Sequence, residues 1–292
     1  MRWLYHIRLG SGSPLPARYA HASLASEGFL HASFQSDVIE SARLYFPAGA
    51  ELSVLRIDPR RLDVRVEIAA TPRGPMPHVH GAVPRDAIVE EMTIAAVVGA
   101  PDRVEGTRFA FVAFEGMTLL DLVGIHDPLS RLASMGFDET STCAIVSAAG
   151  SRVWAQGGAV ITVDAVRPPL DAFDVLVVPG GYGTRALEND AAVIAWLRSF
   201  PENRIVASVC TGALLLGAAG RLRGKRATTH HSAMDRLAEF EAIATRARVV
   251  DEGQVVTGGG VTCALDVGMH LVRRLAGDDV AQAIARQMEL PA

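Results

Sequence analysis

The sequence predicts a two-domain protein in which a small α+β domain precedes an α/β domain built on a doubly wound, mostly parallel sheet. Three observations support this prediction. The chain has 292 residues, which is long for a single hydrophobic core. From residue 108 onward, strands of the buried type alternate with segments of helical spacing. Between the two parts, residues 95–107 lose all periodicity, so we expect domains at 1–97 and 108–292 joined by a linker at 98–107.

The composition excludes several classes of protein. Hydrophobic residues make up 49% of the chain and charged residues 21%, as in ordinary globular proteins. A net charge of −4 provides no basic surface for nucleic acid or for an anionic membrane. No segment has the length of a transmembrane helix, and the first residues lack the pattern of a signal peptide. We therefore expect a cytoplasmic protein that binds neither nucleic acid nor membrane.

Cysteine usage points to reactivity. The chain has only three cysteines, and they lie far apart at Cys143, Cys210 and Cys263. An odd number at wide spacing predicts neither a disulfide framework nor a structural zinc site. Any cysteine with a special role in this chain is therefore expected to be a reactive thiol.

The first domain is predicted from short segments in order. Apolar and polar residues alternate at 3–9, which predicts a half-buried strand. A helix is expected at 36–45, where Pro47 ends it. The remaining expected elements are strands at 52–57 and 64–69, and a closing strand or short helix at 88–94.

Three segments of this domain resemble a family of small bacterial domains of unknown function. They are Tyr5-His6-Ile7, Glu27-Gly28-Phe29-Leu30-His31 and Pro77-His78-Val79-His80-Gly81, within a resemblance that covers about residues 3–95. His80 stands where that family usually has tyrosine. The resemblance implies a mixed α+β fold distantly similar to that of ADP-ribosyltransferases, but a fold implies no activity.

The histidines of this domain have two interpretations. His6, His31 and His78 are candidates for lining a small-molecule pocket, and the alternative is that they are half-exposed or hydrogen-bonded structural residues. His78 and His80 share one face of an extended segment, as two metal ligands would. No third ligand is placed beside them, so we predict no metal site.

The second domain alternates strands and helices. Strands are expected at 108–114, 142–147, 159–163, 173–178, 205–209, 226–230, 247–251 and 254–257, with Val153-Trp154 forming an excursion beside the third. Helices are expected at 117–135, 190–199, 211–219, 232–240, 262–275 and 279–288, and Asp127-Pro128 could restart the first of them. This alternation implies a parallel, doubly wound sheet.

Cys210 lies at the centre of the predicted chemistry. It ends the apolar run Arg204–Val209, and small residues and leucines with helical spacing follow it, so it is expected on a sharp strand-to-helix turn. Such a turn pushes the side chain out of the sheet, and the helix that follows directs its free N–H groups toward the sulfur. Both effects favour a thiolate. The alternative is that Cys210 is simply a small buried hydrophobic residue.

Three segments are expected to meet at the carboxyl ends of the strands, where sites form in open α/β sheets. They are Glu115–Asp121, Gly180-Gly181 and Cys210-Thr211. Asp121 has an alternative role as a cap of the helix that begins near Thr118. The triplet Gly258-Gly259-Gly260 lacks the residues of a nucleotide site and is read as close packing before a helix.

Five motifs in order make residues 108–290 resemble the superfamily of DJ-1, the PfpI proteases and isonitrile hydratase. They are Phe114-Glu115-Gly116 with Asp121, Val178-Pro179-Gly180-Gly181, Ser208-Val209-Cys210-Thr211-Gly212-Ala213, Arg226-Ala227-Thr228-Thr229-His230, and Thr257-Gly258-Gly259-Gly260-Val261-Thr262. The resemblance implies a flavodoxin-like fold, shared with class I glutamine amidotransferases, and a homodimer. Cys-Thr at the turn and the aspartate after the first strand are most similar to the isonitrile hydratase branch.

That branch implies roles for individual residues. Cys210 would be the nucleophile, Asp121 the acid and base, and Thr211 an accessory group, with no metal or organic cofactor. The thiolate and a proton would add to the isonitrile carbon, and water would convert the thioimidate to an N-substituted formamide. A proton donor near neutral pH needs a raised pKa, which burial of Asp121 would supply. PfpI-type proteases carry histidine where Thr211 stands, so the base for peptide hydrolysis is missing.

Further residues are expected around this pair. The N–H groups of Gly181 and Thr211 are candidates for an oxyanion hole, and Gly180 would let the backbone approach a ligand. Tyr182 and His231 are candidates for substrate contact, with surface or packing roles as the alternative. The domain departs from isonitrile hydratases at Gly124-Ile125, where they tend to have Gly-Pro, and at His230-His231, where they have His-Trp. The substrate therefore stays open.

Two other functions remain possible. A DJ-1-like activity on glyoxals would use the same thiol and acid. Alternatively, the domain is a metabolite or redox sensor, because the superfamily supplies the sensing domain of AraC-type regulators. Those regulators carry a DNA-binding module after this domain, and here only Pro291-Ala292 follow the last predicted helix, so direct DNA binding is not expected.

Overall fold

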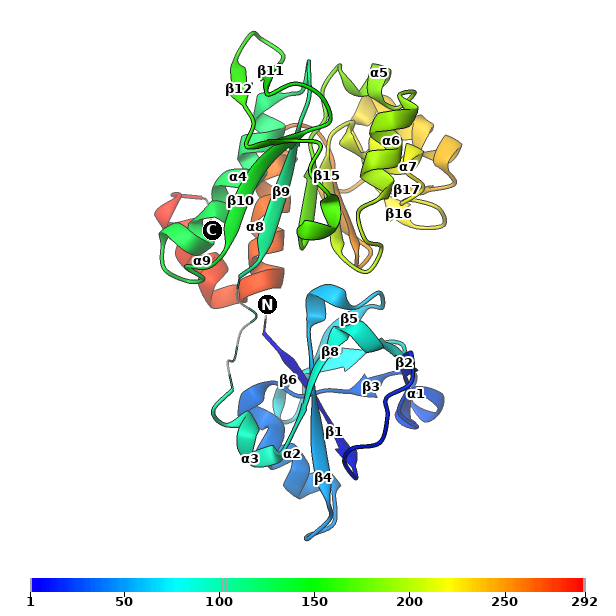
Figure 1. The fold of residues 1–292 in the computed structure, drawn as a ribbon, viewed down its shortest axis with the longest axis vertical. Coiled ribbons are helices and arrows are strands. Elements are labelled where there is room, and N and C mark those ends of the chain that lie inside the picture. Colours follow the sequence, from blue (N-terminus) through cyan, green and yellow to red (C-terminus); the bar gives the residue numbers. More distant parts are fainter. Residues whose placement is uncertain (1, 101, 103, 105, 291–292) are drawn as a thin grey trace. The chain divides into compact units, whose positions relative to one another are not determined.

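The computed structural model describes residues 2–100, 102, 104 and 106–290, drawn as a ribbon in Figure 1. Residues 101, 103 and 105 of the predicted linker, and the final Pro291-Ala292, lie outside the described residues. The chain divides into two compact units between residues 104 and 105. Each unit is described by itself.

The first unit contains two three-stranded antiparallel sheets, in the orders β1-β4-β8 and β3-β6-β5. A bridge between Tyr5 and Ser33 connects them, and the short strands β2 and β7 pair separately. The strands are β1 Leu4–Leu9, β2 Arg18–Tyr19, β3 Leu30–His31, β4 Leu52–Ile57, β5 Val66–Thr71, β6 Gly74–Val79, β7 Val83–Pro84 and β8 Ile88–Met92. The helices are α1 Ser23–Ser26, α2 Val38–Tyr45 and α3 Ile94–Val97.

Two details of this unit differ from expectation. Strand β1 is buried on both faces rather than one, because Leu4 packs into one hydrophobic cluster and Tyr5 into the other. Strand β6 was not expected, since Pro75 and Pro77 lack the N–H groups that a strand normally uses. The carbonyl of Pro77 nevertheless accepts the N–H of Ala32, so the ladder uses the acceptor that proline retains.

The second unit contains a seven-stranded sheet in the order β13-β10-β9-β14-β15-β19-β18. Every neighbouring pair is parallel except β18 and β19. The central strands β14 and β15 are buried along their whole length, as runs of β-branched residues predict. The expected doubly wound, mostly parallel sheet is confirmed.

The elements of this unit follow the expected alternation. The strands are β9 Arg108–Ala113, β10 Thr142–Ser147, β11 Arg152–Trp154, β12 Val160–Thr162, β13 Ala165–Val166, β14 Val175–Val178, β15 Ile205–Val209, β16 Arg226–Ala227, β17 Ile243–Ala244, β18 Val249–Asp251 and β19 Val255–Gly258. The helices are α4 Leu119–Ser134, α5 Thr184–Leu187, α6 Ala191–Arg198, α7 Gly212–Ala218, the 3-10 helix η5 His231–Phe240, α8 Cys263–Ala276 and α9 Asp278–Gln287.

Helices α4 and α8 cover one face of the sheet, and α6 and α7 cover the other (Figure 1). Helices α4 and α8 pack closely because each has a glycine at their contact. A Cβ on Gly124 would stand 2.7 Å from the Cβ of Ala264, and one on Gly268 would stand 3.0 Å from the Gly124 carbonyl. Pro128 lies inside α4, which continues through it rather than restarting there. No described helix is long and apolar enough to cross a membrane.

Candidate active site

Cys210 directly follows β15 and precedes α7. Its backbone has φ of 55°, the left-handed region that residues with a Cβ rarely adopt. The Cys210 N–H donates to the carbonyls of Gly258 and Gly259, at 3.1 and 2.7 Å, and these hydrogen bonds hold the turn. The side chain is only 5% exposed. A Cβ on Gly258, the first glycine of the triplet, would stand 2.5 Å from a methyl carbon of Val267, so this glycine allows close packing.

The three predicted segments lie together at the carboxyl end of the sheet. The N–H of Thr118 donates to the Gly180 carbonyl at 2.9 Å, which joins the first segment to the second. The N–H of Gly181 donates to the Thr211 hydroxyl at 3.0 Å, which joins the second to the third. A Cβ on Gly180 would stand 2.6 Å from the Thr211 nitrogen, so only glycine fits there.

Asp121 lies in the first turn of α4 and is completely buried. Its Oδ2 accepts the N–H of Gly180 at 2.9 Å, whereas its Oδ1 has no hydrogen-bond partner among the described residues. The hydrogen bond of its side chain goes to Gly180 rather than to an N–H group of α4, which disfavours the capping alternative. Burial raises the pKa of Asp121 to about 6, while hydrogen bonds from Gly180 and from the Cys210 thiol act to lower it.

The surroundings of Cys210 oppose the thiolate that the turn and the helix start are expected to favour. Burial, and secondarily the charge of Asp121, raise the pKa of Cys210 to about 11. The N–H and hydroxyl of Thr211 act in the opposite direction and do not outweigh them. Burial and the charge of Asp121 therefore both favour the protonated form of the Cys210 thiol.

The expected oxyanion hole is only partly free. The N–H of Gly180 is engaged by Asp121, and the N–H of Gly181 is engaged by the Thr211 hydroxyl. The N–H of Thr211 faces the Cys210 sulfur. Of the two expected donors, the Gly181 N–H is therefore already engaged, and an oxyanion hole formed with Thr211 stays a prediction.

Tyr182 and His231 lie at the surface. Tyr182 is 62% exposed, with the Arg185 guanidinium 4.6 Å from its ring centre. His231 is exposed at the start of η5, its ring 4.2 Å from that of His230. Their contact with substrate stays a prediction.

Sequence reasoning missed two supports of the site. The hydroxyl of Thr229 donates to the Cys210 carbonyl at 2.7 Å, a role that its place in the Thr228-Thr229-His230 motif could have suggested. The β11–β12 hairpin is tied to the first segment, because the N–H of Gly116 donates to the Trp154 carbonyl at 2.8 Å. The N–H of Trp154 in turn donates to the Glu115 carboxylate at 3.1 Å. The sequence indicated Val153-Trp154 beside a strand at 159–163, but it gave no signal that this hairpin contacts the site.

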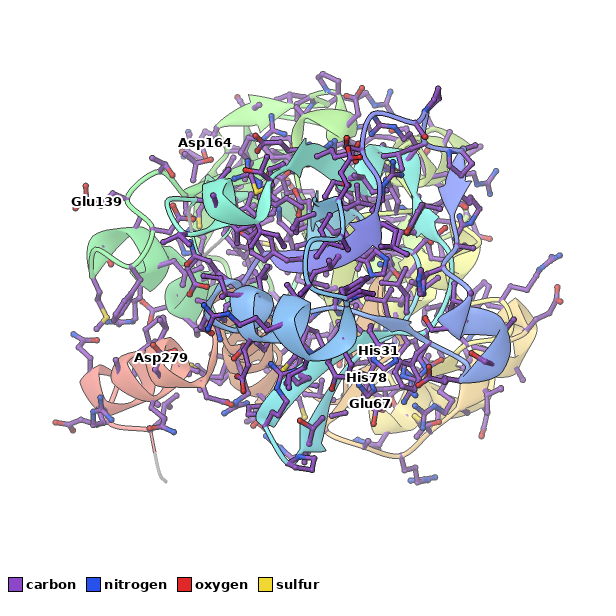
Figure 2. All side chains as sticks on the ribbon, turned by 90° about the horizontal axis from the view of Figure 1, so that it is seen from below. His31, Glu67, His78, Glu139, Asp164 and Asp279 are labelled. Carbon is purple, nitrogen blue, oxygen red and sulfur yellow. The ribbon has the colours of Figure 1, made fainter. Side chains whose placement is uncertain are left out.

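In the first unit, the three predicted pocket histidines have different surroundings. His6 is buried, with one ring nitrogen 2.7 Å from the His31 carbonyl and the other 3.0 Å from the Tyr19 hydroxyl. His31 and His78 are directly paired on β3 and β6, and Glu67 is paired with His78 from β5. Figure 2 shows the side chains of His31, His78 and Glu67 next to one another. A pocket formed by the histidines stays a prediction.

The rings around His78 form an aromatic cluster. Phe29 stacks on His78 with ring centres 3.8 Å apart. The outer nitrogens of the flanking histidines bind carboxylates, His31 to Glu27 at 2.9 Å and His80 to Glu67 at 3.0 Å. In the part of the chain that the structure describes, no three His, Cys, Asp or Glu side chains are arranged to hold a metal ion.

Two family models match the chain, one in each unit. The DJ-1/PfpI family model matches residues 107–274, which is more than half of the chain. A family of unknown function, DUF952, matches residues 15–91.

Individual relatives match the second unit. An isonitrile hydratase from Pseudomonas putida is 36% identical over 183 residues, covering 62% of this chain and 78% of the relative. The HTH-type transcriptional regulator CdhR from Pseudomonas aeruginosa is 28% identical over 186 residues. That match covers 62% of this chain and 54% of the regulator, so the chain spans about half of the regulator's length.

Solved structures share the fold. A ThiJ/PfpI family protein from Pseudomonas syringae has a TM-score of 0.58 at 34% identity, covering 65% of this chain and 77% of that one. DJ-1beta from Drosophila melanogaster has a TM-score of 0.56 at 21% identity, covering 64% of this chain and 100% of that one. The similarity to DJ-1beta, at 21% identity, concerns the fold alone.

Proposed function

Because the chain belongs to the DJ-1/PfpI family, we propose that its second unit is a cofactor-free lyase that adds water to an isonitrile through Cys210. The product is an N-substituted formamide. The observation that carries this proposal is the buried Asp121 carboxyl, whose Oδ1 has no hydrogen-bond partner among the described residues, and which is joined through Gly180 to the turn that holds Cys210. The 36% identity to an isonitrile hydratase supports the same substrate class.

The first half of the reaction joins the substrate to the enzyme. Asp121 takes the Sγ proton and delivers it to the terminal carbon of the isonitrile, whose lone pair accepts it. The sulfur then bonds to that same carbon, giving a thioimidate in which the carbon carries one hydrogen and is doubly bonded to nitrogen. The proton and the sulfur thus add to one atom, and the substrate nitrogen needs no donor in this step.

The second half releases the product. Asp121, again a carboxylate, removes a proton from water as the oxygen adds to the thioimidate carbon. The C=N π pair moves onto nitrogen as the oxygen adds, and it re-forms the double bond as the carbon–sulfur bond breaks. The proton on Asp121 returns to Sγ. The imidic acid so formed transfers its O–H proton to nitrogen and becomes the formamide. Each turnover consumes one isonitrile and one water and restores the original thiol and carboxylate.

The hydrogen bonds of the turn favour this chemistry over the glyoxal alternative. Attack on a carbonyl places negative charge on oxygen, which backbone donors usually stabilise. Here the N–H groups of Gly180 and Gly181 already donate to Asp121 and Thr211. The first half of the isonitrile reaction, which adds a proton and sulfur to one carbon, does not require those donors.

The test uses the purified full chain with an aliphatic isonitrile in heavy water, and follows the formamide by NMR. The proposal expects deuterium on the formyl carbon. Cys210→Ala and Asp121→Asn should each lower turnover by at least about a thousandfold, as losses of a nucleophile or its base do. Asp127→Asn is the matched control, because Asp127 lies on the same helix but pairs with Arg131. Consumption of glyoxals without isonitrile turnover would favour the alternative.

A sensor is the second candidate function, supported by the similarity to the regulator CdhR. Tight binding of a small molecule without turnover of either substrate class would favour it. The expected homodimer also stays a proposal, which light scattering coupled to size-exclusion chromatography tests.

A further inference from the structure

Two segments of the second unit are each anchored by a hydrogen bond to the turn that holds Cys210. The Gly181 N–H donates to the Thr211 hydroxyl at 3.0 Å, and helix α5 begins three residues after Gly181. The hydroxyl of Thr229 donates to the Cys210 carbonyl at 2.7 Å, and helix η5 begins two residues after Thr229. Each segment is therefore held at the end that lies nearest to Cys210.

The outer parts of the two segments are joined by the Glu188–Arg236 ion pair. One guanidinium nitrogen of Arg236, on η5, donates to both carboxylate oxygens of Glu188, at 2.8 and 3.0 Å. Glu188 directly follows α5, and its side chain is only 10% exposed. A nearly buried carboxylate that accepts at both oxygens gains more from such a pair than an exposed one. The pair of Arg236 with Glu239, at 2.9 Å, lies within η5 itself.

Both segments also pack against α7, the helix that follows the turn. A Cβ on Gly217 of α7 would stand 2.4 Å from the Phe240 ring, so the end of η5 lies directly on this helix. Along α5, the Glu188 N–H donates to the Thr184 carbonyl at 2.9 Å, and the Thr184 hydroxyl donates to the Gly181 carbonyl at 2.8 Å. The position of Glu188 is therefore connected to the anchored residue Gly181.

The two candidate substrate contacts lie on these segments. Tyr182 directly follows Gly181, and its ring contacts the guanidinium of Arg185 on the same segment, 4.6 Å away. His231 begins η5, and its ring contacts that of His230, 4.2 Å away. Each of these contacts lies within one segment, so it does not fix the spacing between the two segments. The ion pair described above does.

We propose that Arg236 is a positioning residue for the substrate of Cys210. Through Glu188 it holds the segment that carries Tyr182 against the segment that carries His231, and so sets how tightly the site binds the substituent of its electrophile. The substrate class in this inference rests on the proposed function, whereas the positioning of the two segments does not. When the ion pair is lost, the inner hydrogen bonds still hold Cys210. Substrate binding should therefore weaken more than the chemical step slows.

The experiment compares Glu188→Gln with Glu239→Gln in the full chain. Each substitution removes one carboxylate charge that Arg236 contacts and keeps the size of the side chain, but only the first acts between the segments. The substrates are methyl isonitrile and cyclohexyl isonitrile, which differ in the size of the substituent. Glu188→Gln should raise KM for cyclohexyl isonitrile about tenfold, and should change kcat for both substrates, and KM for methyl isonitrile, by less than about twofold. Glu239→Gln should change none of these constants.

Hydrogen exchange of the same variants gives a readout that needs no substrate. In Glu188→Gln, peptides covering residues 181–188 and 229–240 should both exchange about threefold or more faster than in the wild type. Peptides covering β14 and β15 should be unchanged, which shows that the fold is intact. Arg236→Ala should repeat this result. Arg236→Lys keeps the charge without the planar donor group and should give exchange rates between those of Arg236→Ala and the wild type.

Unchanged exchange of both peptides in Glu188→Gln would overturn the inference, as would equal effects of Glu188→Gln and Glu239→Gln. A fall in kcat for both isonitriles with no change in KM would also overturn it, because the pair would then act on the nucleophile rather than on substrate binding. If the exchange rises as expected but the wild type turns over neither isonitrile, the proposed function fails. The substrate class in this inference then fails with it, and the positioning of the two segments by Arg236 stands.

Discussion

Gly180 donates its N–H to Asp121 at 2.9 Å and lies directly against Cys210, so one backbone residue sets the position of the proposed acid relative to the proposed nucleophile. The two side chains come from different elements, α4 and the end of β15. Their relative position therefore depends on how closely the turn after β14 approaches both.

Replacing Gly180 with alanine should disrupt this arrangement. The new Cβ would stand 2.6 Å from the Thr211 nitrogen and 2.8 Å from the Cys210 Cβ, so the turn must shift. We expect a loss of about 1–3 kcal/mol in the free energy of unfolding and at least about a hundredfold loss of isonitrile turnover. Urea unfolding and a turnover assay measure the two effects. Gly260→Ala is the matched control, since its Cβ would meet only His230 at an ordinary 3.6 Å and should change little.

Thr211 offers a test of the turn's hydrogen bonds. Its hydroxyl accepts the Gly181 N–H at 3.0 Å, so Thr211→Val leaves that N–H without a partner. We expect about a tenfold to hundredfold fall in kcat, because one hydrogen bond beside the reacting atoms is lost. Thr211→Ser keeps the hydroxyl and should restore most of the activity. Equal losses in both variants would contradict the role of the hydroxyl.

The pH dependence of turnover should reflect the protonation of Asp121 and Cys210. The first proposed step needs the Asp121 carboxylate and the Cys210 thiol together. With pKa values of about 6 for Asp121 and about 11 for Cys210, kcat/KM should rise as the pH passes through about 6 and then stay level. It should fall again only as the thiol loses its proton. A rate that rises through about pH 8 to 9 instead would indicate an isolated cysteine.

Asp121→Asn should stabilise the protein while inactivating it. The pKa of Asp121 is raised by about two units in the folded state, so its proton stabilises the fold at low pH and this stability is lost as the pH rises through about 6. The amide carries no charge at any pH. We expect the variant to be more stable above about pH 6 by up to ~3 kcal/mol, and no more stable below about pH 4. Urea unfolding at both pH values measures this difference.

His6 should make the first unit sensitive to acid. Burial lowers its pKa to about 4, so the neutral ring stabilises the fold above its ordinary pKa of 6.5. This stability is lost as the pH falls from about 6.5 through 4, by up to ~3 kcal/mol. Hydrogen exchange of the β1 peptides, corrected for intrinsic rates, should show the loss. His6→Gln should flatten it, whereas the exposed His231→Gln should leave it unchanged.

The fold of the second unit could largely be predicted from the sequence because its strands are continuous apolar runs. Strand β10 was expected at its observed bounds, and β9 within one residue. The expected strand 226–230 ends after Ala227, because the N–H of Thr228 donates to the Thr257 hydroxyl instead of to a carbonyl of a neighbouring strand. The expected helix 232–240 is 3-10, which helical spacing alone does not distinguish over so short a segment.

The residues of the candidate site could be predicted from the sequence, but the effect of their surroundings on the pKa of Cys210 could not. Cys210, Asp121 and Thr211 follow from motifs at strand ends, where topology brings them together. The protonation of Cys210 does not follow from them. The start of a helix favours a thiolate, but burial and the charge of Asp121 depend on packing that only the folded chain shows.

The left-handed backbone at Cys210, with φ of 55°, bears on how this protein would change over generations. Glycine adopts that conformation without strain, whereas a residue with a Cβ loses roughly 1 kcal/mol there. A lineage with no use for the thiol would therefore drift toward glycine, gaining stability as it lost chemistry. The strained backbone at Cys210 is therefore in keeping with the reactive role proposed for its sulfur.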